Sequence, residues 1–365
     1  MSSLDKTAWA FELDRVLAAL EALYQRGARN FKFVDRTFNL KIDHSVRILQ
    51  FFLDKLPMTS AVVDCGAAPL SDLHGADALG QNGASGSQLF LHFEVIPDHL
   101  LDRLKAMLAQ FPPGVLQLEV GVQSFNEVVQ HTISRRQDNA ATEANLRWLL
   151  VHSHAHLHAD LIFGLPGETL QSFAEGFERL LAMGPHEIQL GILKRLRGTP
   201  ITRHTQTHGM VYATEPPYTV QQTGVVDADT VQRFTRFARY WDVLANSGRF
   251  GQTLALLLQT PQPARSAATQ PDSPFWRFMA LSGWLWQRMG ATHQLTPELL
   301  VDALFDYLSQ SLPPEVVRQA LLADYIASGA RANPKALQGL LPRQAPAQAK
   351  ATQTLATRQD RHRAL

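Results

Sequence analysis

Residues 158–169 of the chain read HADLIFGLPGET. The apolar run that includes residues 161–163 stops at Gly164-Leu165-Pro166-Gly167, and a carboxylate follows at Glu168. Strands usually end at glycine and proline, because the sheet ladder needs backbone N–H groups and negative φ angles. Two glycines, a proline and an acid within residues 164–168 are more than a strand end requires. The stretch therefore indicates a strand followed by a turn with a binding or positioning role.

Helices and short strands alternate from residue 8 to about residue 200. Short apolar runs predict strands at 30–34, 88–95, 115–125, 157–163 and 187–194. Helical periodicity predicts helices at 9–27, 42–56, 97–111, 139–153 and 169–184. Strands separated by helices in this way favour a parallel sheet of βαβ units. Because no GxGxxG turn is present, an open or partial barrel is favoured over a dinucleotide-binding sheet, with its site at the carboxyl ends of the strands.

Composition divides the rest of the chain. We expect a barrel over 1–200, a mainly helical C-terminal domain over 201–342 and a disordered tail over 343–365. A stretch rich in glycine, alanine, serine and aspartate, residues 57–87, reads as an insertion between a helix and a strand. Residues from about 259 to 274 read as a linker, and the segments after it, 275–289 and 295–308, as helices.

The bulk numbers exclude several classes of protein. A formal net charge of +1 gives no electrostatic reason to expect nucleic acid or an anionic membrane as a partner. The single cysteine, Cys65, allows no internal disulfide and no metal site built of cysteines alone, and it suggests a reducing compartment. The sequence shows neither a signal peptide nor an apolar stretch of about 18 residues, so we expect a cytoplasmic protein.

Several carboxylates stand in or just after separate strands. Each alone has a plain alternative as a loop cap or as the partner of a buried arginine, but their recurrence favours a polar site at the barrel mouth. These carboxylates are Asp35, Glu94, Glu119, Asp160 and Glu168. Basic residues after the last strand (Lys194, Arg195 and Arg197) are suited to hold a carboxylate or a ribose edge, or simply to face solvent.

Histidines alternate in the run HSHAHLH, at positions 152, 154, 156 and 158. On one continuous strand they would form a row of imidazoles able to bind zinc or nickel. The run crosses a predicted helix end, a turn and a strand start, so we expect it to leave one face and predict no metal ligands. A phosphate-binding GxxxxGK[ST] loop and a GxSxG nucleophile elbow are both absent from the sequence.

Taken together, the strand-end motifs resemble the radical S-adenosylmethionine (SAM) superfamily. The likeness is to cobalamin-binding-type members, in a subgroup with a C-terminal domain of unknown function. The motifs are FKFVDRTFN (31–39), LHFEVIPD (91–98), LEVGVQSFN (118–126), HADLIFGLPGET (158–169), QLGILKRLRGTP (189–200), EPPYTVQQT (215–223) and WDVLANSGRF (241–250). The resemblance implies a partial (β/α)6 TIM-like barrel in which SAM lies across the strand tips and chelates one iron of a 4Fe-4S cluster.

The resemblance also implies roles for individual residues. Asp35 would contact the SAM amino group. Residues of the 118–126 motif would contact the ribose and the methionine carboxylate: Glu119, Gln123 and Ser124. The turn of the 158–169 motif would pack on adenine, with its glycines allowing close backbone approach: Asp160, Gly164, Pro166, Gly167 and Glu168. The segment after the last strand would supply the other adenine wall: Leu193, Lys194 and Leu196.

The sequence departs from the family in one large respect. Such clusters are held by a CxxxCxxC motif after the first barrel strand, and this chain has none. In relatives, a segment similar to SSLDKTAWAF follows that motif, and here it occupies residues 2–11. We therefore hypothesise an N-terminally truncated protein that lacks the cobalamin domain, the first strand and the cluster cysteines. The strand at 30–34 would then be an uncovered edge.

Three functions stay open on this basis. In the first, the full-length parent cleaves SAM at a 4Fe-4S cluster for radical chemistry on an unknown substrate, with cobalamin. In the second, the chain is a non-catalytic remnant or subunit that binds an adenosine-like ligand, or a partner chain carrying the missing half. In the third, it is a cluster-independent TIM-like metal hydrolase. The motif residues Tyr218, Trp241 and Asn246 have no role assigned by sequence.

Overall fold

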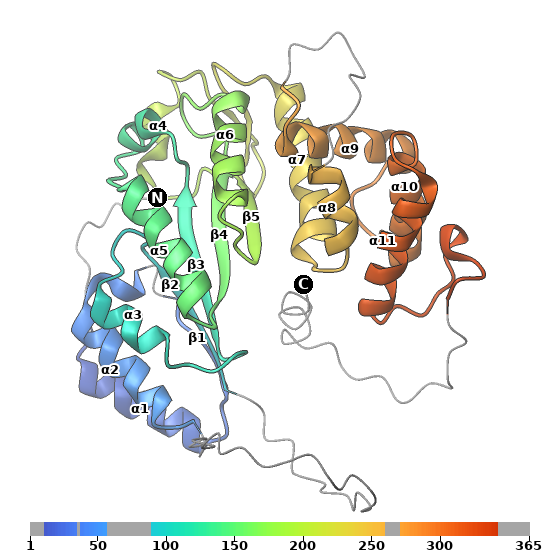
Figure 1. Cartoon of the computed structure of the whole chain (residues 1–365). Coiled ribbons are helices and arrows are strands. Elements are labelled where there is room, and N and C mark those ends of the chain that lie inside the picture. The colour runs from blue at the N-terminus through green and yellow to red at the C-terminus, as the bar shows by residue number, and fades with distance from the viewer. Residues whose placement is uncertain (1–10, 35–36, 57–88, 260–270, 342–365) are drawn as a thin grey trace, which may run out of the picture.

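A computed structural model describes residues 11–34, 37–56, 89–259 and 271–341 of the chain (Figure 1). Asp35, Cys65, the predicted insertion at 57–87, most of the predicted linker and the predicted tail lie outside the described residues. In the described part of the chain, no helix is long and apolar enough to cross a membrane.

A parallel sheet forms the first half of the molecule, with its strands in sequence order. The strands are β1 (Asn30–Lys32), β2 (Phe90–Val95), β3 (Leu116–Gln123), β4 (His156–Phe163) and β5 (Glu187–Ile192). These are the predicted strands, and the singly wound parallel order confirms the predicted TIM-like α/β class. Among the described residues, β1 pairs only with β2, so the strand predicted as an edge is one.

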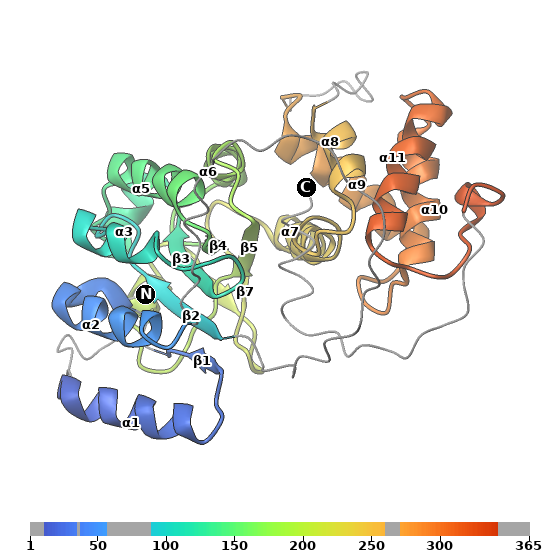
Figure 2. The ribbon, with the colours of Figure 1, turned by 60° about the horizontal axis from the view of Figure 1, so that its bottom comes forward.

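The helices of this half are α1 (Leu13–Gln25), α2 (Ile42–Leu53), α3 (Asp102–Leu108), α4 (Glu127–Thr132), α5 (Asn139–His152) and α6 (Leu170–Leu181), with a short 3-10 helix η1 (Phe38–Leu40). Helices α2, α3, α5 and α6 lie along one face of the sheet (Figure 2). Side chains alternate between the two faces of a strand, and the apolar ones, such as Leu118, Val120 and Val122, are fully buried in the core. The polar side chains of the same strand, such as those of Gln117 and Glu119, project from the opposite face.

The helix predicted over 97–111 is shorter than expected and begins at Asp102. Side-chain amides occupy the carbonyls that an earlier helical turn would need. Asn39 Nδ2 donates to the carbonyls of Ile96 (2.8 Å) and His99 (3.0 Å), and Asn145 Nδ2 donates to the carbonyl of Pro97 (2.8 Å). Segment 96–101 is therefore fixed as a turn by residues far away in the sequence.

The second half of the chain is mainly helical within the range expected for it. It contains η2 (Pro200–His204), a hairpin of β6 (Val211–Tyr212) and β7 (Val220–Gln222), and then α7 (Ala228–Trp241), the π-helix η3 (Asp242–Asn246), α8 (Gly251–Gln259), α9 (Pro274–Met289), α10 (Pro297–Leu308), α11 (Pro314–Ala327) and η4 (Lys335–Leu337). An aromatic cluster joins the two halves. The ring of Phe234 in α7 stacks on Phe163 of β4 at 4.0 Å, and Trp241 packs on Phe177 of α6 at 4.9 Å. One hydrophobic core thus spans both halves.

Residues of the second half cover the outer edge of β5. Asn246 accepts a hydrogen bond from the N–H of Ile188 (3.1 Å) and donates to the carbonyl of the same residue (3.0 Å). Just beyond the carboxyl end of the strand, the N–H of Val220 donates to the carbonyl of Leu193 (2.8 Å). A side-chain amide and a segment of the hairpin therefore take the place of a further strand, which protects the backbone groups that an edge strand exposes.

Candidate functional site

A cavity of about 890 Å³ lies against the polar face of the sheet. It is lined by residues of strands β2 to β5, by Leu193, Lys194 and Leu196 after β5, by the segment between β6 and β7, and by α7 and η3. Six of the residues predicted from the motifs line this cavity: Glu119, Gln123, Asp160, Leu193, Lys194 and Leu196. The other predicted residues in the described part of the chain do not line it: Ser124, Gly164, Pro166, Gly167 and Glu168.

Carboxylates from three neighbouring strands form one polar row in the cavity. Glu94 and Glu119 are register partners on β2 and β3, and Asp160 lies on β4 opposite Gly121 of β3. His92 Nε2 lies 3.0 Å from Glu119 Oε2. This hydrogen bond is the main reason why the pKa of Glu119 lies below its ordinary value.

The pKa of Asp160 is shifted in the opposite direction to that of Glu119. Burial raises it well above the ordinary value, and the negative charge of Glu119 and a hydrogen bond to that carboxylate raise it further. The Oδ1 atom of Asp160 is buried without a hydrogen-bond partner among the described residues. An orphaned polar atom of this kind on a cavity wall fits a polar ligand.

The GLPGE turn locks two loops at the carboxyl end of the sheet. Ser124 Oγ donates to Glu168 Oε1 at 2.5 Å and accepts from the N–H of Asn126 at 3.0 Å. Glu168 is almost completely buried, with 1% exposure, and burial raises its pKa to about 7 against the lowering effect of Ser124. Because Ser124 follows β3 and Glu168 follows β4, this contact fixes the two loops to each other.

Contacts within the protein explain the glycines of the turn. Gly164 (φ +86°) and Gly167 (φ +81°) adopt the left-handed conformation that side chains disfavour. A Cβ atom on Gly164 would lie 2.5 Å from Val220 Cγ1. The close approach seen in the structure is therefore between this turn and β7, and contact of the glycines with adenine stays a prediction.

Replacing Gly164 with alanine is expected to lower the free energy of unfolding by about 2–4 kcal/mol, from left-handed strain and overpacking together. Chemical unfolding of G164A beside wild type measures the loss. In the double variant G164A/V220A the clash with Val220 is relieved, so the second substitution should cost less than V220A alone costs in wild type. Additive losses would show that the contact with Val220 does not explain this glycine.

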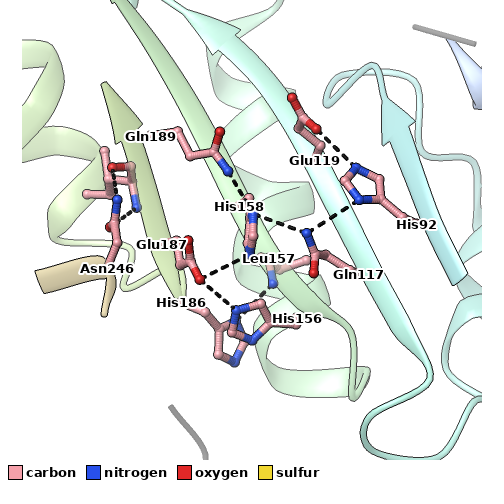
Figure 3. Close-up of polar contacts among 11 residues, drawn as sticks. His92, Gln117, Glu119, His156, Leu157, His158, His186, Glu187, Gln189 and Asn246 are labelled. Carbon is pink, nitrogen blue, oxygen red and sulfur yellow. Dashed lines mark hydrogen bonds and ion pairs between the residues drawn. The ribbon is translucent and has the colours of Figure 1, made fainter. Parts of the chain in front are cut away.

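A second polar row, nearer the amino-terminal ends of the strands, was missed by the sequence reasoning (Figure 3). Gln117 Nε2 lies between His92 Nδ1 (3.4 Å) and His158 Nδ1 (3.2 Å), and Gln189 Nε2 lies 2.8 Å from His158 Nδ1. The signal that could have found the row is strict alternation, since these residues stand two positions before the carboxylate row on β2, β3 and β4. Arg135 was missed as well; it donates to the carbonyl of Gly121, and burial lowers its pKa.

The histidine run crosses a helix end, a connecting segment and a strand start, as its sequence suggested, but its last two histidines share one face of a strand. His152 ends α5 and stacks on Trp148 (5.0 Å), and His154 lies in the following turn. His156 and His158 both lie on β4, two positions apart and therefore on one face.

Known proteins match different parts of the chain. The family described as "Protein of unknown function (DUF4080)" matches residues 206–364. The oxygen-independent coproporphyrinogen III oxidase of Paracoccus denitrificans is 26% identical over 165 residues, which cover 43% of this chain and 36% of that protein. The oxidase of the same name from Escherichia coli K12 is 31% identical over 113 residues, covering 31% of this chain and 24% of the relative. These alignments span less than two fifths of either relative.

Among solved structures, coproporphyrinogen III oxidase (HemN) from Escherichia coli, whose description calls it a radical SAM enzyme, aligns with a TM-score of 0.42 and 17% identity, over 90% of this chain and 77% of that one. The sequence matches to these oxidases agree with the prediction made from the strand-end motifs. This chain is similar to these oxidases over part of its length.

Proposed function

We propose that the cavity binds S-adenosylmethionine and that this chain is the SAM-binding part of a radical SAM enzyme. The observation that carries the proposal is that the carboxylate row and Lys194 line one cavity. SAM is an amphipathic ligand with a sulfonium, an ammonium, a carboxylate, a ribose diol and a flat base. Ionised Glu119 suits a cationic group or a diol, the ammonium of Lys194 suits a carboxylate, and the apolar Leu193 and Leu196 suit a base.

The 4Fe-4S cluster of the family does not fit the residues of this chain. Three thiolates are needed, and the 365-residue sequence contains one cysteine, Cys65, outside the described residues. We therefore propose that the cluster ligands come from outside these 365 residues, either from more of the same polypeptide or from a separate chain. Cobalamin and radical chemistry on a substrate belong to this proposal for the whole protein.

A non-catalytic subunit that binds an adenosine-like ligand is the second candidate, favoured by the same lack of thiolates. The two candidates differ in what cluster reconstitution achieves. If the chain receives its cluster from a partner, anaerobic reconstitution with iron and sulfide gives SAM cleavage only when that partner is added. A subunit of the second kind binds the ligand but never supports cleavage. Four irons bound by this chain alone would contradict our statement that the cluster does not fit it.

The binding proposal is tested with SAM and S-adenosylhomocysteine by isothermal titration calorimetry, because neither ligand needs the cluster in order to bind. We expect Glu119→Gln to weaken SAM binding at least tenfold, about the free energy of one charge-assisted hydrogen bond. Asp160→Asn is the matched control. The pKa of Asp160 is raised and that of Glu119 is lowered, so the amide removes less negative charge at position 160, and we expect SAM affinity to fall less than in E119Q.

S-adenosylhomocysteine lacks the sulfonium charge, so E119Q should weaken its binding less than that of SAM. Thermal unfolding of each variant checks that the fold is retained. If neither ligand binds at millimolar concentration, or if E119Q binds SAM like wild type, the proposed site is wrong.

A further inference from the structure

Three buried metal-ligating side chains meet at the amino-terminal ends of β4 and β5. They are His156, His158 and Glu187, with exposures of 4%, 8% and 3%. His156 and His158 project from the same face of β4, and Glu187 is the register partner of His158 on β5. Figure 3 shows the carboxylate of Glu187 between the two imidazoles. His158 is the register partner of Glu119 on β3, and His156 stands two positions before it, toward the amino-terminal end of β4. Neither Glu119 nor Asp160 belongs to the group.

The distances within this group suit a metal ion better than a simple ion pair. Oε1 of Glu187 lies 3.4 Å from His156 Nε2 and 3.3 Å from His158 Nε2, and the three ligand atoms lie within 4.8 Å of one another. A charge-assisted hydrogen bond between nitrogen and a carboxylate is normally about 2.7–2.9 Å. Ligand bonds of about 2.0–2.1 Å in a tetrahedral zinc site put neighbouring ligand atoms roughly 3.3–3.4 Å apart, which is the length of the tetrahedron edge.

His158 provides a second, independent observation. Its Nε2 atom is buried and has no hydrogen-bond partner in the described part of the chain, although it faces Glu187. Its other ring nitrogen, Nδ1, faces the side-chain amides of Gln189 and Gln117 at 2.8 Å and 3.2 Å. A histidine that binds a metal through Nε2 carries its proton on Nδ1, so in the metal-bound site these amides would turn their oxygens to Nδ1 and accept its N–H.

The composition of the group indicates the class of ion. Two imidazoles and one carboxylate are the protein ligands of many zinc sites and of non-haem iron sites that keep open positions. His158 and Glu187 line the large cavity, so an open coordination position is able to face it.

We infer that His156, His158 and Glu187 form a mononuclear site for a divalent transition metal, with zinc as the ion that its tetrahedral spacing fits. The site does not depend on SAM or on an iron–sulfur cluster, and its ligands all come from this chain. It lies on the inner face of the sheet, below the proposed SAM site, so a metal here would tie β4 to β5 at their amino-terminal ends.

The test uses the full chain, stripped with a chelator and titrated with Zn²⁺ against a chromophoric competitor. We expect one equivalent to bind with a dissociation constant below 1 µM, and we expect Zn²⁺ to raise the unfolding temperature. His158→Asn and Glu187→Gln, which preserve much of the side-chain volume, should each weaken binding at least 100-fold and abolish the temperature shift. Co²⁺ as a spectroscopic probe should give tetrahedral d–d bands in wild type that both variants lose.

The matched control is His208→Asn. His204 and His208 form another pair of neighbouring imidazoles, with ring centres 5.6 Å apart, away from the buried group. His208→Asn should leave the affinity for the one tightly bound equivalent of Zn²⁺ unchanged. The inference is overturned if wild type binds no stoichiometric Zn²⁺ at micromolar concentration, if H158N and E187Q bind as tightly as wild type, or if only H208N loses the metal. Retained secondary structure in H158N and E187Q, measured by circular dichroism, separates loss of the site from loss of the fold.

Discussion

Replacing Asn246 with alanine is expected to lower the free energy of unfolding by about 2–5 kcal/mol, because two buried backbone groups lose their partner. The Asn246 amide accepts from the N–H of Ile188 and donates to its carbonyl, at 3.1 Å and 3.0 Å, and the asparagine is 4% exposed. Alanine offers neither group, and water from the cavity that Asn246 lines would have to replace both bonds. Urea unfolding of N246A and wild type at one pH measures the difference.

Two further variants make the result specific. Asn246→Asp keeps an acceptor for the N–H of Ile188 but sets a carboxylate oxygen against its carbonyl, so this variant should also be destabilised. Ser247→Ala is the control, since Ser247 stands next to the same site but makes only long contacts. Its Oγ lies 3.5 Å from the carbonyl of Leu244 and accepts from the N–H of Arg249 at 3.3 Å. A loss in N246A no larger than that in S247A would show that the edge of β5 does not depend on this side chain.

Asn246 also shows where sequence reasoning reaches its limit. The motif WDVLANSGRF marked the residue, but its partner lies 58 positions earlier in the chain, and no local pattern indicates that an amide replaces a strand. The same holds for the start of α3, which Asn39 of η1 and Asn145 of α5 fix from distant positions in the chain. The strands themselves were predictable, because each is a short apolar run bounded by turn residues. Their order follows from the βαβ rule.

The candidate site was predictable in the same uneven way. Glu119 and Asp160 were predicted from the rule that barrel sites lie at the carboxyl ends of strands, although the structure places them within β3 and β4. Glu187 and Gln117 were missed because they stand at the opposite ends, where this rule expects structural residues. Glu168 was placed near adenine, whereas the structure puts its carboxylate against Ser124 and outside the cavity lining.

Glu168→Gln is expected to stabilise the protein at pH 8 by up to about 3 kcal/mol relative to wild type, and by almost nothing at pH 4.5. Burial raises the pKa of Glu168 to about 7 from its ordinary value of 4.5. Below pH 4.5 the folded and unfolded chains both hold the proton, so the shift has no effect on stability. Between pH 4.5 and 7 the unfolded chain loses the proton first, and wild type becomes progressively less stable. Above pH 7 the full difference remains, at about 1.4 kcal/mol for each pKa unit.

Glutamine cannot ionise and still accepts the hydrogen bond from Ser124. The difference in the free energy of unfolding between E168Q and wild type therefore measures the effect of the Glu168 charge alone. Urea unfolding at intervals from pH 4.5 to 8.5 should show this difference growing with pH. Half of the change should be reached between the pKa of Glu168 in the unfolded chain and its pKa in the folded protein. Ser124→Ala provides the control. Ser124 Oγ donates to the ionised carboxylate and lowers its pKa, so its removal should raise the pKa and extend the loss of stability to higher pH. A gap between E168Q and wild type that stays constant across this pH range would mean that Glu168 is solvated in the folded protein, and the loop contact between β3 and β4 would then need another explanation.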